Sequence, residues 1–81
     1  MKIPQTLNKG TAKIIGAIEH VPGTALVLVE ITNRATFVTA QINAASLSED
    51  EWYGGNYFDN KTEAVVDFCK RLSRLFMVAQ G

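Results

Sequence analysis

Apolar and β-branched residues are concentrated in three segments of the first half of the chain, at residues 11–20, 25–32 and 36–43. The first two segments are separated by the residues Val-Pro-Gly-Thr. Pro22 has the φ angle of the second position of a tight turn, and Gly23 accepts the positive φ of the third. Asn-Arg separates the second and third segments, and asparagine also tolerates positive φ. The pattern therefore predicts a three-stranded antiparallel meander.

The two turns imply registers that agree with each other. If Val21 pairs with Thr24, Ile18 lies opposite Val27 and Ile14 lies opposite Ile31. If Thr32 pairs with Ala35, Val29 lies opposite Val38, Val27 opposite Ala40 and Ala25 opposite Ile42. Side chains alternate between the faces of a strand, so both registers place one set of residues on a first face: Ile14, Ile18, Val27, Val29, Ile31, Val38, Ala40 and Ile42. The second face carries Ile15, Ala17, Leu26, Leu28 and Phe37, interleaved with polar residues.

The second half of the chain predicts a fourth strand and a helix. Residues 52–58 are aromatic, and their Gly-Gly pair is typical of a β-bulge or a close backbone approach. Residues 44–51 form a connector in which Ser-Leu-Ser-Glu allows one helical turn. A helix is expected from Lys61 to about Val78, with Asn60 as its N-cap. Its apolar positions have helical spacing and are expected to be buried: Val65, Phe68, Cys69, Leu72, Leu75 and Phe76.

These elements predict one α+β domain over residues 1–81. It comprises an extended N-terminal arm over residues 1–10, an antiparallel β-meander of three to four strands over residues 11–58, and one C-terminal amphipathic helix packed on one face. The second face is then left without a cover. Exposed apolar surface of that kind marks contact sites, so we expect a homodimer or larger oligomer through Ile15, Leu26, Leu28 and Phe37.

Composition disfavours several classes of function. Eight basic residues balance eight acidic ones, so the chain has no net charge and no overall field for non-specific nucleic-acid binding. One Cys and one His cannot form a structural zinc site, so no metal is expected, and no cofactor is expected either. A single Cys also excludes an internal disulfide framework, which favours a reducing compartment and predicts a cytoplasmic protein. The longest apolar run is too short to span a bilayer, so no membrane partner is expected.

Two groups of residues are candidates for binding. Lys70, Arg71 and Arg74 form a basic group late in the helix, which either complements the helix dipole or contacts an anion or a partner. Trp52, Tyr53 and Tyr57 could stack on bases, as the aromatic residues of RNA-binding sheets do. Acidic residues flank this aromatic strand, however, and favour packing in a core or an interface.

The C-terminal third resembles small uncharacterised proteins of bacteriophages and mobile elements. That family has a β-meander, an aromatic strand of the Gly-His-Tyr-Phe kind, and a helix that carries Ala, Phe and Arg. The matching residues lie between positions 36 and 71: Thr36, Phe37, Val38, Gly55, Asn56, Tyr57, Phe58, Ala64, Phe68 and Arg71. Asn56 stands where the family usually has His. The resemblance implies a phage or mobile-element accessory protein, of the kind that counters host defence.

Three functional hypotheses follow, and an enzyme is the least favoured class because no catalytic constellation is present. The first is a non-enzymatic protein–protein interaction module that binds a host protein, in its sharpest form an inhibitor of the anti-CRISPR kind. The second is a small nucleic-acid or nucleotide binder that uses the basic helix residues and the aromatic strand. The third is an oligomer with a small-molecule pocket at its subunit interface.

Overall fold

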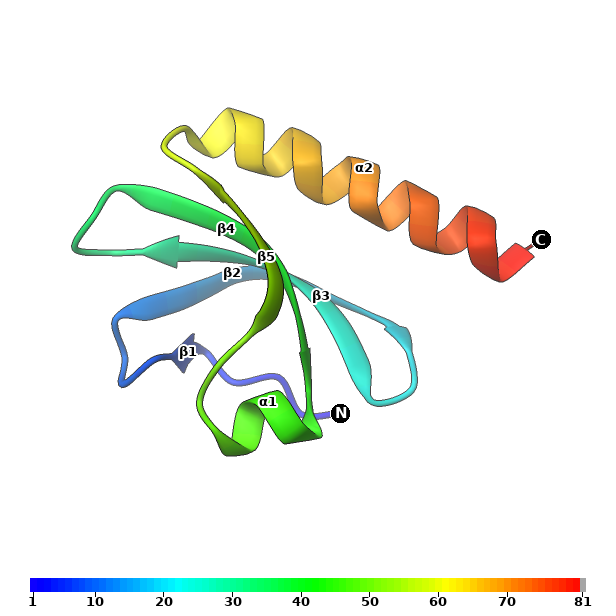
Figure 1. Cartoon of the computed structure of the whole chain (residues 1–81), viewed down its shortest axis with the longest axis horizontal. Helices are drawn as coiled ribbons and strands as arrows, with labels where there is room; N and C mark the ends of the chain where they lie inside the picture. The colour runs from blue at the N-terminus through cyan, green and yellow to red at the C-terminus, as the bar shows by residue number, and fades with distance from the viewer. Residues whose placement is uncertain (81) are drawn as a thin grey trace.

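A five-stranded antiparallel sheet with one long helix forms the fold, as the computed structural model shows for residues 1–80 (Figure 1). For residues 76–80 only the backbone is described. The strands lie in the sheet in their sequence order, β1-β2-β3-β4-β5. The elements are β1 (Thr6–Leu7), β2 (Ala12–Val21), β3 (Thr24–Ile31), β4 (Thr36–Asn43), α1 (Ala44–Ser48), β5 (Tyr53–Phe58) and α2 (Lys61–Gln80). The α+β class is confirmed, with one more strand than expected because part of the arm pairs with β2 as β1.

The register of β3 against β4 is the predicted one. Val29 pairs with Val38, Val27 with Ala40, and Ala25 with Ile42, and no bulge interrupts the ladder. All six side chains are 0% exposed. Uninterrupted alternation over eight residues therefore fixes which side chains of these two strands share a face.

The predicted pairing of β2 with β3 is wrong everywhere except next to the turn, because two bulges interrupt β2, and Ile14 lies opposite Val29 instead of Ile31. Val21 pairs with Thr24 as predicted, but the bulge next to Glu19 moves Ile18 opposite Leu26 instead of Val27. A second bulge between Ile14 and Gly16 shifts the register again. Each extra residue moves the following side chains to the other face. Ile14 therefore keeps its predicted face, whereas Ile18 and Ala17 exchange faces.

Helix α2 covers the face that was expected to be open. Side chains of α2 hydrogen-bond to Thr39, which pairs with Leu28 and shares its face. Leu26 is 0% exposed and Leu28 is 7% exposed, and neither belongs to the main hydrophobic cluster on the opposite face. The prediction of an uncovered apolar face at these residues is therefore wrong for the single chain.

The opposite face is covered by the two ends of the curled sheet. Leu7 of β1 is buried in the main cluster, and Ile3, Leu47 and Trp52 pack against it. Figure 1 shows α1 and β1 on the side of the sheet away from α2. The β1–β2 turn also bonds to the α1–β5 connector, because the Asn8 and Lys9 amides donate to Asp50. The sheet thus bends around its own core.

Capping residues start both helices. Asn43 caps α1 through a reciprocal pair with Ser46, so this turn begins before the predicted Ser-x-x-Glu box. Asn60 caps α2 as predicted, because its Oδ1 accepts from the Glu63 amide at 3.1 Å. Each cap satisfies backbone donors that would otherwise lack a partner at the start of a helix.

The buried stripe of α2 is rotated relative to the prediction. Ala64 is 0% exposed, and the half-buried residues of the stripe are Asp67, Phe68, Arg71, Leu72 and Leu75. Val65 is 37% exposed and Cys69 is exposed, so burial of these two side chains was predicted wrongly. Asp67 and Arg71 face the sheet because the Thr39 hydroxyl donates to Asp67 and the Thr39 carbonyl accepts from Arg71. The predicted burial of Phe76 lies outside the described side chains.

Glu19 holds the N-terminal arm and the β2–β3 turn together. Its Oε1 accepts from the Met1 amino group at 2.6 Å, and its Oε2 accepts from the Gly23 amide at 2.9 Å. These bonds, first that of the amino group and then that of the amide, lower the pKa of Glu19 below its ordinary value of 4.5. Both bonds favour the charged carboxylate.

We expect the folded state to lose this contribution in acid. A carboxyl group whose pKa is lowered by folding stabilises the folded state at any pH above its ordinary pKa. This stabilisation is lost as the pH falls through the lowered pKa. The melting temperature of the wild type should therefore fall more steeply than that of Glu19→Gln between about pH 5 and pH 3. If the melting temperatures of the two proteins fell by the same amount over this pH range, Glu19 would not hold the arm.

Candidate functional site

Strand β5 forms one edge of the sheet, and its outer side pairs with no described strand. It is six residues long and carries no charged residue. Tyr53 is 39% exposed and Tyr57 is 60% exposed. The opposite edge differs, because there the two-residue β1 and the arm lie against β2. Exposed edge strands present unpaired amides and carbonyls to other chains, so β5 is the candidate interaction edge.

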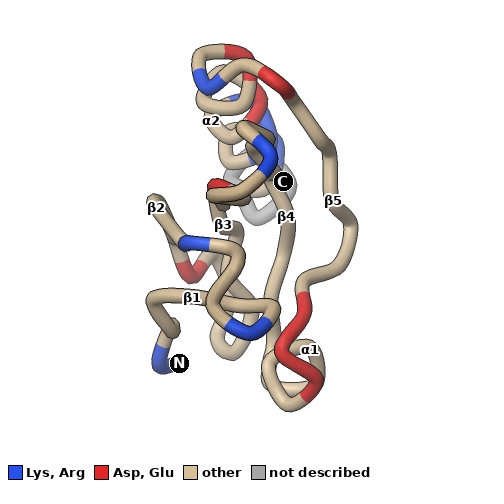
Figure 2. Tube along the Cα trace, turned by 90° about the vertical axis from the view of Figure 1, so that its left-hand side faces the viewer, with Lys and Arg blue, Asp and Glu red and all other residues tan. Residues whose placement is uncertain are grey.

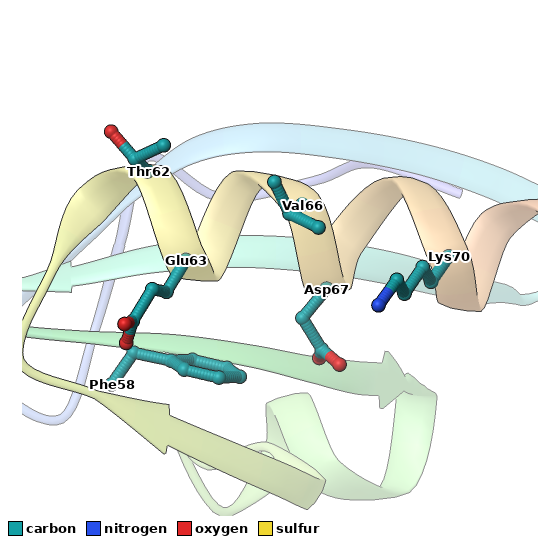
Figure 3. A pocket seen from close by; sticks show the side chains of 6 residues that line it. All are labelled: Phe58, Thr62, Glu63, Val66, Asp67 and Lys70. Atoms are coloured by element: carbon teal, nitrogen blue, oxygen red, sulfur yellow. The ribbon is translucent and has the colours of Figure 1, made fainter.

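A groove of about 330 Å³ lies between β5 and α2, and we call it the β5–α2 groove (Figure 3). Its lining residues come from the end of β5 and from the first half of the helix: Phe58, Thr62, Glu63, Val66, Asp67 and Lys70. In Figure 3 the Glu63 and Asp67 carboxylates point from the helix toward the strand that carries Phe58. Val66 is 47% exposed. The groove thus combines apolar surface with two carboxylates and one amine.

A polar network behind the groove fixes α2 on the sheet. Thr39 is 0% exposed, and its hydroxyl donates to Asp67. Arg71 Nη1 donates to the Thr39 carbonyl at 2.9 Å and to the Gly54 carbonyl at 2.8 Å. Asn56 Nδ2 also donates to Asp67, at 3.2 Å. Asp67 and Arg71 are therefore connected through β4 and β5 and not through a direct ion pair with each other.

Two glycines make the irregular part of β5 possible. The register of β4 and β5 shifts across Gly54 and Gly55, as the predicted bulge requires. Gly54 has φ +61°, which favours glycine. A Cβ at Gly55 would lie 3.1 Å from Tyr57 Cε1 and 3.2 Å from Trp52 Nε1. The bulge turns the Gly54 carbonyl toward Arg71 and leaves room for two aromatic rings.

The structure separates the three basic residues late in α2 that were candidates for an anion or partner contact, Lys70, Arg71 and Arg74. Arg71 is half-buried, and its guanidinium is bound to the sheet. Lys70 is exposed and lines the groove, whereas Arg74 is exposed and does not. An anion site that uses all three side chains is therefore not assembled.

The aromatic residues are also separated. Tyr53 pairs with Gln41, which shares the α2 side of the sheet with Leu26. Tyr57 pairs with Val38 on the other side, where Trp52 Nε1 donates to the Tyr57 hydroxyl at 3.0 Å. The three rings do not form one stacking platform.

The four residues of the predicted oligomer face lie mostly inside the single chain. Leu26 and Leu28 are buried, while Ile15 and Phe37 are half-buried. The largest exposed apolar side chains of the described residues lie elsewhere, at Met1, Val21, Tyr53, Tyr57, Val65 and Val66. Contact of Leu26 or Leu28 with a second chain would require α2 to move.

Acidic residues surround β5. Figure 2 shows acidic positions at both ends of this strand: Asp59 follows it directly in the sequence, and Glu51 lies two residues before it. Within the described residues, no group of three or more His, Cys, Asp or Glu side chains could hold a metal ion. None of the described helices is long and apolar enough to cross a membrane. The local charge therefore favours basic partners over phosphates.

Sequence reasoning missed Thr39, Asp67 and Phe58 as parts of this site. Thr39 looked like an ordinary polar position of a strand, and Asp67 like a solvated helix residue. One signal was available: Asp67 and Arg71 lie at helical spacing from the apolar Ala64 and Phe68, on the stripe that packs on the sheet.

No family model, no curated protein and no solved structure matches this chain. The residues of the phage-like resemblance can nevertheless be placed. Asn56, Ala64 and Arg71 are docking contacts or buried residues between α2 and the sheet. Val38 and Tyr57, which also carry the resemblance, pair with each other on the face of the sheet away from α2.

Proposed function

We propose that this chain is a non-enzymatic protein-binding module that receives an extended segment of a partner protein along β5. The observation that carries the proposal is the free outer edge of this uncharged strand beside the β5–α2 groove. A peptide that adds to a sheet edge gains affinity from main-chain hydrogen bonds and specificity from pockets for alternate side chains. The groove supplies such a pocket on the α2 side.

The chemistry of the groove favours a partner segment with basic and apolar side chains. A strand added to β5 would direct every second side chain toward Phe58 and Val66, which provide apolar contact. Glu63 and Asp67 would face a lysine or arginine of the partner. The acidic residues at both ends of β5 would also attract a basic partner segment over a longer range.

The phage-like resemblance suggests a sharper form of this proposal, in which the partner is a protein of a host defence system. Binding of nucleic acid is less well supported, because the Arg71 guanidinium is occupied and carboxylates flank the aromatic strand. Edge pairing with a second copy of the chain is the form that self-association would take. Nucleic acid and a second copy of the chain are both outcomes of the experiment below.

Two neighbouring valines of α2 provide a matched test. Val66 lines the groove, whereas Val65 is similarly exposed but does not line it. Peptides selected from a random display library on the wild-type protein should be rich in Lys and Arg. Val66→Lys should weaken their binding at least tenfold, through lost apolar contact and like-charge repulsion, and Val65→Lys should not. Bound peptide should also slow amide exchange along β5.

Several outcomes would contradict the proposal. They are a selection that yields no specific peptide, peptides that bind Val66→Lys as well as the wild type, and unchanged exchange of the β5 amides. A gel shift with RNA or DNA that weakens on Lys70→Ala would favour nucleic acid instead. Sedimentation of the wild type as a dimer that Val66→Lys dissociates would assign the edge to a second copy of the chain.

A further inference from the structure

A second cleft lies at one end of the curled sheet, where three loops meet. Its volume is about 340 Å³, and its lining residues are the apolar Ile31 and six residues with polar or aromatic side chains, Asn8, Thr11, Asn33, Arg34, Trp52 and Tyr57. A smaller hollow of about 200 Å³ adjoins it, since Asn8 and Trp52 line both. Asp50 and Glu51 line the smaller hollow. The β5–α2 groove shares no lining residue with either cavity, so this cleft is a separate feature.

Two aromatic rings in the cleft are held against each other. Trp52 Nε1 donates to the Tyr57 hydroxyl at 3.0 Å. Gly55 leaves room for this arrangement, because a Cβ there would lie within 3.2 Å of both side chains. Trp52 also packs against the main hydrophobic cluster, while Tyr57 is 60% exposed. The cleft therefore offers an oriented aromatic surface before any ligand arrives.

Hydrogen bonds hold the loops around the cleft. The Asn8 amide donates to the Asp50 carbonyl at 3.2 Å, and the Thr11 hydroxyl donates to the Asn8 carbonyl at 2.7 Å. Thr32 donates from its amide to the Thr11 carbonyl at 3.1 Å, which joins the second loop to the first. All non-glycine residues with positive φ among those described belong to these loops: Asn8, Lys9, Ala35 and Asp50. Strained backbone of this kind persists where the surroundings impose it and is common at binding sites.

We propose that this cleft binds a neutral saccharide. The negative faces of the aromatic rings attract the C–H groups of a sugar ring. The Asn8 and Asn33 amides both donate and accept, and Arg34 donates, which suits a ring of hydroxyl groups. No described residue accepts a hydrogen bond from these three side chains.

The charges around the cleft favour a neutral ligand over a nucleotide. Arg34 is the only basic residue that lines the larger cavity, and Asp50 and Glu51 line its neighbour. Carboxylates repel phosphate but accept readily from hydroxyl groups. A nucleotide would gain stacking on the rings but would place its phosphate near these acids.

Trp52 provides a direct reporter, because the chain has one tryptophan. Maltotriose, cellotriose and chitotriose are titrated separately into the protein while the fluorescence of Trp52 and its indole proton resonance are followed. At least one should shift both signals with a dissociation constant of about 1 mM, as expected for small ligands in open clefts. Asn33→Ala and Arg34→Ala should each weaken binding about tenfold, and Lys13→Ala should not. All three substitutions replace exposed residues, so circular dichroism should remain unchanged.

The proposal is overturned if none of the three sugars shifts either signal at about 20 mM, well above the expected constant. It is also overturned if adenosine monophosphate binds more tightly than all three, which would assign the cleft to nucleotides. Equal weakening by Lys13→Ala would show that binding occurs elsewhere on the surface. Val66→Lys should leave saccharide binding intact, which separates this cleft from the peptide edge.

Discussion

Leu28→Glu is expected to abolish folding. Leu28 is 7% exposed in the sheet beneath α2, and its partner in β4 is the fully buried Thr39. A carboxylate at this position would be buried near the Asp67 carboxylate, and the Arg71 guanidinium is already bound to the carbonyls of Thr39 and Gly54. Its burial would therefore cost several kcal/mol. That cost is comparable to the whole free energy of unfolding of a small domain, about 5–15 kcal/mol. Circular dichroism and the dispersion of amide resonances should show an unfolded chain.

This result distinguishes the two possible positions of the helix. If α2 covered the other face and Leu28 faced a second subunit, Leu28→Glu would yield a folded monomer. Val65→Glu is the control, because Val65 is 37% exposed on the outer part of α2, and the variant should remain folded. A cooperatively folded, soluble Leu28→Glu protein would show that α2 does not pack on this face.

The sequence predicts the centre of the sheet well because its local signals agree there. Between Val29 and Val38 the turn is short, alternation is regular and no bulge intervenes. One pairing therefore determines the face on which every side chain of these two strands lies. The N-cap at Asn60 and the glycine bulge of β5 were predicted for the same reason, since each depends on the chemistry of one or two residues.

The bulges of β2 could not be predicted in this way. One falls between Ile14 and Gly16 and the other between Glu19 and Val21, and neither has a Gly pair to mark it. Together the two bulges shift the register by two residues, which restores the face but not the partner. A register without bulges therefore places Ile14 on the correct face, opposite Ile31 instead of Val29, and Ile18 on the wrong face. The pairing of Thr6–Leu7 is too short to give a periodic signal, and the fifth strand was therefore missed.

The face covered by α2 depends on contacts that the helix sequence does not contain. Apolar periodicity alone would turn Val65 and Cys69 toward the sheet and Asp67 and Arg71 toward solvent. In the structure Val65 and Cys69 are exposed, and Asp67 and Arg71 bond to the sheet. The reason lies in β4, where the buried Thr39 both donates to Asp67 and accepts from Arg71. The two hollows also escaped prediction. The groove depends on how α2 is rotated on the sheet, and the cleft forms where loops that are distant in sequence meet.

Arg71→Ala is expected to destabilise the fold by about 2–3 kcal/mol. The guanidinium donates to the carbonyls of Thr39 and Gly54, and so links α2 to two adjacent strands. Removing it leaves both acceptors without this charged donor and takes packing from the half-buried part of the helix. Urea unfolding should show a lower midpoint with an unchanged slope, since the same surface is exposed on unfolding.

Two further variants separate the loss of these bonds from the loss of charge. Arg74→Ala removes the same charge from an exposed position and should change stability by less than about 0.5 kcal/mol. Arg71→Lys should fall between the two alanine variants, because lysine keeps the charge and the donors, but its side chain is one bond shorter and does not place its nitrogen where Nη1 bonds both carbonyls. In Arg71→Ala the amides of β5 should also exchange faster than those of β3, because β5 is an edge strand that α2 helps to hold. Equal stability of Arg71→Ala and Arg74→Ala would show that the buried network does not hold the helix on the sheet.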